Sequence, residues 1–283
     1  MLEERCRFDW YQATVPASVP LLEMLLDERL PSDRQKEDGK PANSFKKALN
    51  WKSKETAEVY AGMMWGGVNP HPHLTGAGDS GELIAKLLRE TFPDHRVARV
   101  DVAIDMRGDG LFDDLFALLA RTSAKYRNLS GKRILGDSPD DGSTYYLGAP
   151  TSAIRVRLYE KGKQLYKQTG DPVWRMFFDW ARLEIQVRPQ KAFKSQAASM
   201  PPDAFWGCAA WTRDLARDCL ALKPEPVTMK PTRIADHERA MRALAAQYGP
   251  TLLRDLARRN GNVEEWAQSL LARITPAESR EAA

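Results

Sequence analysis

Three short segments of the sequence alternate apolar residues with residues that can do chemistry. They are "RVDVAID" at 99–105, "IRVRLYEKGK" at 154–163 and "RLEIQV" at 182–187. Because successive side chains of a β-strand point to opposite faces, each segment predicts a strand with one apolar and one polar face. The polar faces carry carboxylates, guanidinium groups and one phenol: Asp101, Asp105, Arg155, Arg157, Tyr159, Arg182 and Glu184.

If these strands are neighbours, their polar residues converge on one surface. Carboxylate oxygens are ligands that suit Mg²⁺ or Mn²⁺, and arginines bind phosphates through paired hydrogen bonds. A phenol beside them predicts phosphoryl transfer from a nucleic-acid strand to the tyrosine oxygen. The ordinary pKa of tyrosine, near 10, leaves about one part in a thousand ionised at neutral pH, so a metal and nearby cations would have to lower it.

The tyrosine segment is strongly basic. Between Ile154 and Lys167 the sequence has five Lys or Arg residues and only one acid, Glu160. This local excess of +4 equals the net charge of the whole chain. A solvated edge strand and a phosphate-binding surface would both look like this. Spacing alone does not exclude the nearby phenols, which are Tyr145, Tyr146 and Tyr166.

A second pattern, "NPHPHL", places His71 and His73 two residues apart. On an extended chain both would share one face, as in a histidine metal site. Pro72 lies between them, and proline removes a hydrogen-bond donor from a sheet. A loop or a strand edge is therefore the favoured interpretation.

The order of the expected elements predicts an α+β fold with a largely antiparallel central sheet flanked by helices and a helical C-terminal region. A hairpin is expected at 143–160, without regular βαβ alternation. Residues 31–44 predict an exposed, mobile loop, and Ser80 is a candidate helix cap. Further strands are expected at 7–15, within 46–75, at 95–106 and within 175–190, and helices at 16–30, 80–93, 109–126, 203–223 and in two segments ending near 274.

A proline-rich break at about 223–231 predicts two parts, a catalytic region 1–222 and a helical region 232–283 for DNA recognition or dimerisation. Basic residues of the second part are mixed with acids, which is typical of a solvated face. They are Arg239, Arg242, Arg254, Arg258 and Arg259.

The overall composition is that of a soluble globular protein, with 43% hydrophobic and 28% charged residues among 283. Forty-two basic against thirty-eight acidic residues is too mild an excess to indicate nucleic-acid binding by itself. Three scattered cysteines and an N-terminus without an apolar stretch predict a reduced, cytoplasmic setting. No apolar run approaches the roughly 18 residues of a membrane span, so no membrane association is expected.

Three blocks together resemble the Rep_trans family, the replication initiation factors of rolling-circle plasmids and filamentous phages. The blocks are "ARVDVAIDM", "TYYLGAPTSAIRVRLYEKGKQ" and "WARLEIQVR", in this order, within about 95–190. The segment "AQYGPTLLRDLARRNG" is similar to C-terminal helices of phage members. The turn "GAPTS" departs from the family, where a charged residue more often stands beside the serine, but this concerns the hairpin.

The resemblance implies a role for each residue type. It implies Tyr159 as the nucleophile, and acidic ligands for Mg²⁺ or Mn²⁺ in place of histidines, which argues against His71 and His73. The matching ligands are Asp101, Glu184 and Asp105, and the residues that would hold DNA phosphates are Arg155, Arg157, Lys161 and Arg182.

The activity implied by the resemblance is rolling-circle replication initiation. Such an enzyme nicks one strand at an origin, keeps the 5′ phosphate as a phosphotyrosine, leaves a 3′ hydroxyl and later rejoins the strand. The implied partners are origin DNA, single-stranded or hairpin at the nick, and the host helicase and polymerase. A homodimer is a separate expectation, from the helical C-terminal region. Alternatives are a relaxase for conjugative mobilisation with the same chemistry and a non-catalytic DNA-binding regulator on the same scaffold.

Overall fold

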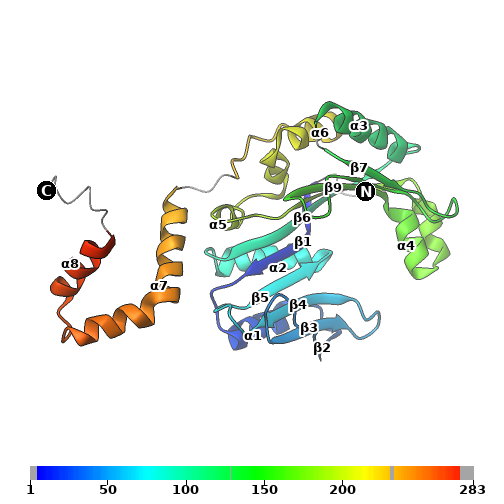
Figure 1. The fold of residues 1–283 in the computed structure, drawn as a ribbon. Coiled ribbons are helices and arrows are strands. Elements are labelled where there is room, and N and C mark those ends of the chain that lie inside the picture. Colours follow the sequence, from blue (N-terminus) through cyan, green and yellow to red (C-terminus); the bar gives the residue numbers. More distant parts are fainter. Residues whose placement is uncertain (1–4, 128, 230–232, 275–283) are drawn as a thin grey trace. The chain divides into compact units, whose positions relative to one another are not determined.

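The structure, a computed structural model, describes residues 5–127, 129–229 and 233–274. The chain divides into two compact units, Met1–Lys230 and Pro231–Ala283. The first contains a sheet and its covering helices, and the second contains two helices (Figure 1).

Within the described residues, the first unit is built on one ten-stranded sheet in the order β2-β3-β4-β5-β1-β6-β10-β9-β8-β7. Every neighbouring pair is antiparallel, which confirms the predicted α+β class. The strands are β1 (Arg7–Thr14), β2 (Arg34–Asp38), β3 (Lys47–Ser53), β4 (Val59–Trp65), β5 (His73–Ala77), β6 (Arg96–Arg107), β7 (Gly131–Ile134), β8 (Thr144–Leu147), β9 (Ile154–Glu160) and β10 (Trp180–Val187).

The hydrophobic core lies on one face of this sheet. Its strand residues alternate with the polar ones, as Val102, Val156 and Ile185 do, and it is closed by apolar helix residues such as Leu26 and Leu88. α3 and α6 lie side by side over one end of the sheet (Figure 1). The helices of this unit are α1 (Val19–Arg29), α2 (Asp79–Thr91), α3 (Leu111–Lys125), α4 (Lys161–Thr169), α5 (Phe193–Gln196) and α6 (Ala210–Leu220), with 3-10 turns η1 (Pro172–Phe177) and η2 (Pro202–Cys208).

Two local predictions are wrong. Part of the expected mobile loop is strand β2, which pairs with β3 along its whole length. All five of its residues are polar, as suits an exposed edge strand, so no apolar alternation marks it. The helix cap is Gly78, with a φ of 57°, while Ser80 is buried inside the first turn of α2.

The basic segment that contains Tyr159 is only partly a strand. β9 ends at Glu160, and Lys161 begins α4, which contacts β9, β10 and η1. Lys163 and Lys167 therefore lie on a helix. The strand β7 was not predicted, since its four residues carry little pattern.

The second unit contains the two expected helices, α7 (Arg233–Arg258) and α8 (Val263–Ile274). Arg254 and Arg258 are exposed, and Arg259 pairs with Glu265 at 3.1 Å. The side chains of Arg239 and Arg242 lie outside the described part. In the described residues no helix is both long and apolar enough to cross a membrane.

Candidate active site

Strands β6, β10 and β9 are neighbours in that order, so the three polar faces do meet. Arg182 of β10 lies opposite Asp105 of β6 on one side and opposite Tyr159 of β9 on the other. One pair further along, Glu184 lies opposite Arg157. Since directly paired residues of antiparallel strands share a face, the sheet gathers these side chains on the face away from the core.

Tyr159, Glu184 and Arg157 form one connected group. The Tyr159 hydroxyl donates a hydrogen bond to Glu184 Oε1 at 2.7 Å. Arg157 donates to both carboxylate oxygens, from Nε at 3.0 Å and from Nη2 at 2.8 Å. Its guanidinium carbon also lies 4.3 Å from the centroid of the Tyr159 ring. The phenol and the carboxylate are both buried, at 4% and 3% exposure.

The electrostatics of this group keep the phenol protonated. Burial, and then the charge of Glu184, raise the pKa of Tyr159, although Arg182 and Arg157 act in the opposite direction. Burial likewise raises the pKa of the Glu184 carboxyl, against the attraction of Arg157. Nearby cations were expected to lower the pKa of this tyrosine, but burial outweighs their effect. A reaction at Tyr159 therefore needs a proton acceptor, and Glu184 Oε1 is within reach.

A second group surrounds Arg182. Its Nε and Nη2 donate to the two oxygens of Asp105 at 2.6 and 2.7 Å, and its Nη1 donates to Asp9 Oδ1 at 2.9 Å. The indole of Trp180 adds a hydrogen bond to Asp105 at 2.7 Å. Burial opposes ionisation of Asp105, but the hydrogen bonds and charge of Arg182 hold its pKa below the ordinary value.

Asp9 was not among the predicted site residues. It lies in a bulge of β1, where the pairing with β6 shifts between Phe8 and Trp10. A bulge turns an extra side chain out of the regular alternation. The only signal in "RFDWYQ" is a lone carboxylate, which is too little to assign a role.

Asp101 belongs to neither of these two groups. It lies opposite Gln186 of β10, while Asp105 lies opposite Arg182, so Glu184 comes between them along the strand. Arg99 Nε donates to Asp101 Oδ1 at 2.9 Å, and Arg99 Nη2 bonds to the other oxygen. Gln186 donates to Asp101 Oδ2 at 3.2 Å.

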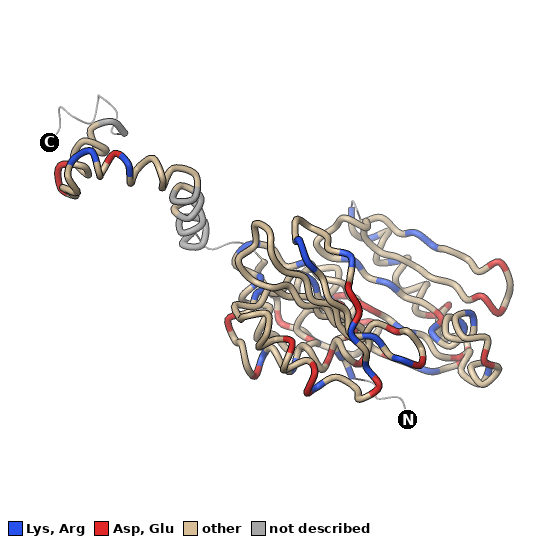
Figure 2. The backbone as a smooth tube through the Cα atoms, turned by 90° about the horizontal axis from the view of Figure 1, so that it is seen from below, with Lys and Arg blue, Asp and Glu red and all other residues tan. Residues whose placement is uncertain are grey.

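Each of the three predicted metal ligands is paired with an arginine in this structure. Each is bonded to a guanidinium: Asp101 to Arg99, Asp105 to Arg182 and Glu184 to Arg157. In the part of the chain that the structure describes, no group of three or more His, Cys, Asp or Glu side chains could hold a metal ion. These pairings are what allow the carboxylates to be buried. Figure 2 shows the same intermixing of acidic and basic positions through the first unit.

The two histidines are not grouped with these residues. His71 is exposed, and His73 is buried at the start of β5. Nδ1 of His73 hydrogen-bonds to the Thr14 hydroxyl at 3.2 Å, and its ring stacks on Phe45. Burial lowers the pKa of His73 to about 4, so the ring is neutral at pH 7.

A hollow of about 340 Å³ opens beside the tyrosine. Tyr159 and Arg157 line one side, and Gln164 and Lys167 of α4 line the other. Lys161 lies above the phenol ring, with Nζ 5.8 Å from its centroid, and burial followed by the charge of Arg182 lowers its pKa.

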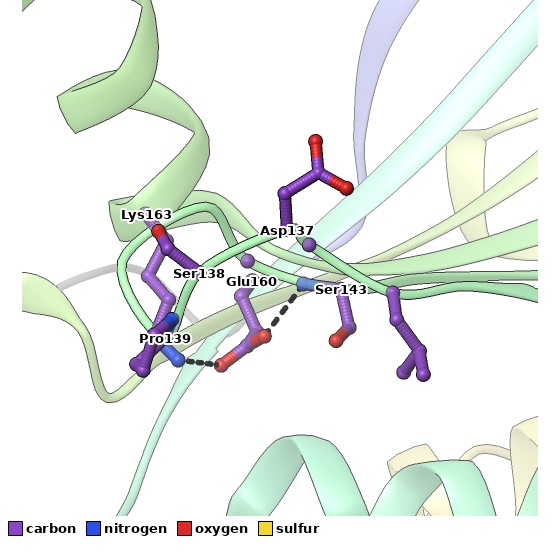
Figure 3. A pocket seen from close by; sticks show the side chains of 9 residues that line it. Asp137, Ser138, Pro139, Ser143, Glu160 and Lys163 are labelled. Atoms are coloured by element: carbon purple, nitrogen blue, oxygen red, sulfur yellow. Dashed lines mark hydrogen bonds and ion pairs between the residues drawn. The ribbon is translucent and has the colours of Figure 1, made fainter.

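A neighbouring hollow shares Glu160 with it and is shown in Figure 3. There Glu160 accepts hydrogen bonds from the Ser143 backbone N–H and from Lys163 Nζ, both at 2.7 Å. These bonds connect the end of β9 and the start of α4 to the loop between β7 and β8 (Figure 3). Arg155 stands apart, stacked on Tyr146 with its guanidinium carbon 3.8 Å from the ring centroid.

The sequence model of the Rep_trans family, described as replication initiation factor, matches residues 95–198. The resemblance to the Rep_trans family is thereby confirmed over this segment. The matched segment contains β6, β9 and β10 and every predicted site residue, whereas Asp9 comes from β1, outside the Rep_trans match.

One solved structure similar to this chain is a rolling-circle replication initiator protein from Geobacillus stearothermophilus. The two share 18% sequence identity with a TM-score of 0.49, over 80% of this chain and 99% of that chain. No curated protein matches this chain in sequence.

Proposed function

We propose that this protein is a rolling-circle replication initiator that nicks one DNA strand at an origin through Tyr159 and later rejoins it. The observation that supports this most is the hydrogen bond from the Tyr159 hydroxyl to a buried carboxylate, within the Rep_trans segment and beside an open hollow. A nucleophile, a proton acceptor and cations for a phosphate are thus adjacent.

In the proposed reaction Tyr159 Oη attacks the phosphorus of one phosphodiester. The phenol proton passes to Glu184, the new O–P bond forms, and the bond from phosphorus to the 3′ oxygen breaks. The 3′ oxygen takes up a proton from water and becomes a hydroxyl, and the 5′ phosphate stays on the tyrosine. Rejoining is the reverse, with a 3′ hydroxyl attacking the phosphotyrosine, so that no outside energy source is needed.

Arg157, Lys161 and Arg182 are the proposed cations for the phosphate near the phenol, with Arg155 further along the strand. Arg157 keeps about a third of its side chain exposed, 35%, on the side of the hollow. The guanidinium of Arg157 can therefore donate paired hydrogen bonds to a phosphate that enters this hollow. Arg182 is 5% exposed, and its proposed part is to act as a nearby positive charge.

A divalent cation, Mg²⁺ or Mn²⁺, is the proposed cofactor, on the ground of the family resemblance and the carboxylate chemistry. Its proposed ligands are Asp101, Glu184 and Asp105, each of which would first have to leave its arginine. Cytoplasmic location, host helicase and polymerase as partners and a homodimer belong to the same proposal.

The test is to incubate the protein with supercoiled DNA that carries its candidate origin, with Mg²⁺ or Mn²⁺ and separately with EDTA. We expect a nicked circle with protein covalently attached to the 5′ end. Tyr159→Phe should abolish this adduct, while the control variants Tyr146→Phe and Tyr166→Phe should keep it.

An adduct formed by Tyr159→Phe would disprove the assignment of the nucleophile. Binding to the origin without cutting, under all metal conditions, would favour a non-catalytic regulator. Equal nicking in EDTA would remove the cation from the proposal.

A further inference from the structure

A third hollow, of about 300 Å³, lies in the strands that precede the Rep_trans segment. It is formed by β1, β3, β4 and β5, and its side chains include Trp10, Asn50, Tyr60 and Met64. A volume at the lower end of the range for ligand pockets suits a small flat group. No residue of this hollow takes part in the proposed nicking chemistry.

This hollow lies on the same face of the sheet as Tyr159. Trp10 lies directly opposite Asp101 of β6 and opposite Ala77 of β5, and Ala77 also lines the hollow. From β9 to β1 there are three strand spacings, about 14 Å across the sheet, and Trp10 lies four residues from the level of Tyr159, about 13 Å along the strands. A single strand bound at Tyr159 can therefore reach the hollow with its neighbouring nucleotides.

The lining has the chemistry that binds an unpaired base. Trp10 lines the hollow, and an indole ring is a surface on which bases stack. The guanidinium of Arg99 lies 4.7 Å from the centroid of the Trp10 ring and adds a cation at this edge. The indole N–H of Trp10 is buried and has no hydrogen-bond partner in the described part of the chain. Asn50 adds an amide that can donate and accept, and Lys40 adds an exposed cation.

A glycine keeps the hollow open. Gly62 of β4 lies opposite Asn50 of β3, and a Cβ atom at Gly62 would lie 3.2 Å from Asn50 Oδ1. Any larger side chain at this position would enter the space beside Trp10. Gly62 is not among the residues with positive φ, so the strand backbone accepts a side chain there.

We propose that this hollow binds one unpaired base of the DNA strand that Tyr159 cuts, a few nucleotides from the cut. This inference rests on the proposed function. The hollow would hold the strand in register across the sheet, so that the correct phosphodiester lies at the phenol.

The experiment uses a single-stranded oligonucleotide that contains 5-iododeoxyuridine, cross-linked by light to the Tyr159→Phe protein, which should bind without cutting. We expect the cross-linked peptides to contain Trp10 or Tyr60. Gly62→Leu, which fills the hollow, should lower this cross-link at least tenfold and weaken binding by roughly 5- to 160-fold, the range for one stacked base. Val68→Leu is the control, because Val68 is 84% exposed in a loop.

Asn50→Leu fills the same hollow from the neighbouring strand and serves if Gly62→Leu does not fold. Cross-links that map elsewhere, or that both filling variants leave unchanged, would overturn the base site. A wild type that nicks DNA but gives no cross-link at the hollow refutes this inference alone. A wild type that never nicks yet cross-links at Trp10 or Tyr60 refutes the nicking proposal and supports the base site.

Discussion

The hydroxyl of Tyr159 and the carboxylate of Glu184 share a hydrogen bond of 2.7 Å between two neighbouring strands. The pKa values of both groups are raised, in each case first by burial. Burial thus favours the neutral form of each, and the arginine beside them supports a negative charge on either. The pair can pass a proton from oxygen to oxygen without a change in its total charge.

Glu184→Gln should distinguish the role of Glu184 as a proton acceptor from its role in holding the surrounding side chains. Glutamine keeps the shape and an oxygen that accepts from Tyr159 and Arg157, but it cannot take the phenol proton. We expect the rate of adduct formation to fall by about 10²- to 10⁴-fold, the usual contribution of a general base. Quenched reactions resolved on denaturing gels measure this rate, and binding of an uncut oligonucleotide is the control. Adduct formation at the wild-type rate would contradict the role of Glu184.

Arg182→Lys should destabilise the fold more than its conservative nature suggests. Lysine cannot reproduce the fork that bonds Asp105 and Asp9 together, so buried carboxylates lose part of their hydrogen bonds. We expect a loss of about 3 kcal/mol in the free energy of unfolding, measured with urea.

The matched control for this change is Arg107→Lys. Arg107 pairs with Asp179 at the surface, with side-chain exposures of 38% and 26%. The control should cost no more than about 1 kcal/mol. Equal losses in the two variants would show that the Arg182 group has no special structural part.

His73 should make stability depend on pH. Its folded pKa of about 4 lies below the ordinary 6.5 because the ring is buried. Between these values the unfolded chain binds more protons than the folded one, so stability is complete above pH 6.5 and falls as the pH drops toward 4. The total loss should be about 3 kcal/mol, at ~1.4 kcal/mol per pH unit.

Urea unfolding at a series of pH values tests this expectation. His73→Gln should lower this slope, and the contribution of the buried His95, whose pKa burial also lowers, should remain. His71→Gln should leave the slope unchanged because His71 is exposed. A wild-type slope that survives in His73→Gln would assign the titration to another group.

Gly162→Ala should disturb the wall of the hollow beside Tyr159. A Cβ atom at Gly162 would overlap the backbone carbonyl oxygen of Phe177, so α4 and η1 would have to move apart. We expect a cost of about 1–3 kcal/mol and slower adduct formation, since α4 carries Gln164 and Lys167. Gly249→Ala, in α7, is the control. A Cβ atom added at Gly249 would meet no atom within 4 Å outside the helix backbone beside it, so this change should not destabilise the protein. An unchanged unfolding curve for Gly162→Ala would contradict the tight contact.

The strands β6, β9 and β10 could be predicted because their alternation of apolar and polar residues is strong. Val100, Val102 and Ile104 alternate with polar residues, and the same holds in β9 and β10, so which residues share a face follows directly. That the strands are neighbours depends on pairing between segments far apart in the chain, which alternation does not encode. The antiparallel class could be predicted from the hairpin and the element order.

The electrostatic state of the site could not be predicted in the same way. The raised pKa of Tyr159 depends on how deeply the sheet and α4 bury it, and the positive charges around it gave the opposite expectation. The pairing of the carboxylates with arginines depends on the strand register, which places Arg157 opposite Glu184 and Arg182 opposite Asp105. Asp9 lay beyond prediction because a bulge, and not the alternation, sets its direction.

The pairing of arginines with carboxylates changes the number of counter-ions that DNA binding would release. A phosphate that takes Arg157 away from Glu184 replaces one anion by another, and the freed carboxylate then attracts a counter-ion from solution. Fewer ions are therefore released overall than the number of arginines would give. The affinity for DNA should vary with salt less steeply than a count of guanidinium groups predicts, and DNA that does not fit the site would have to compete with the protein's own acids.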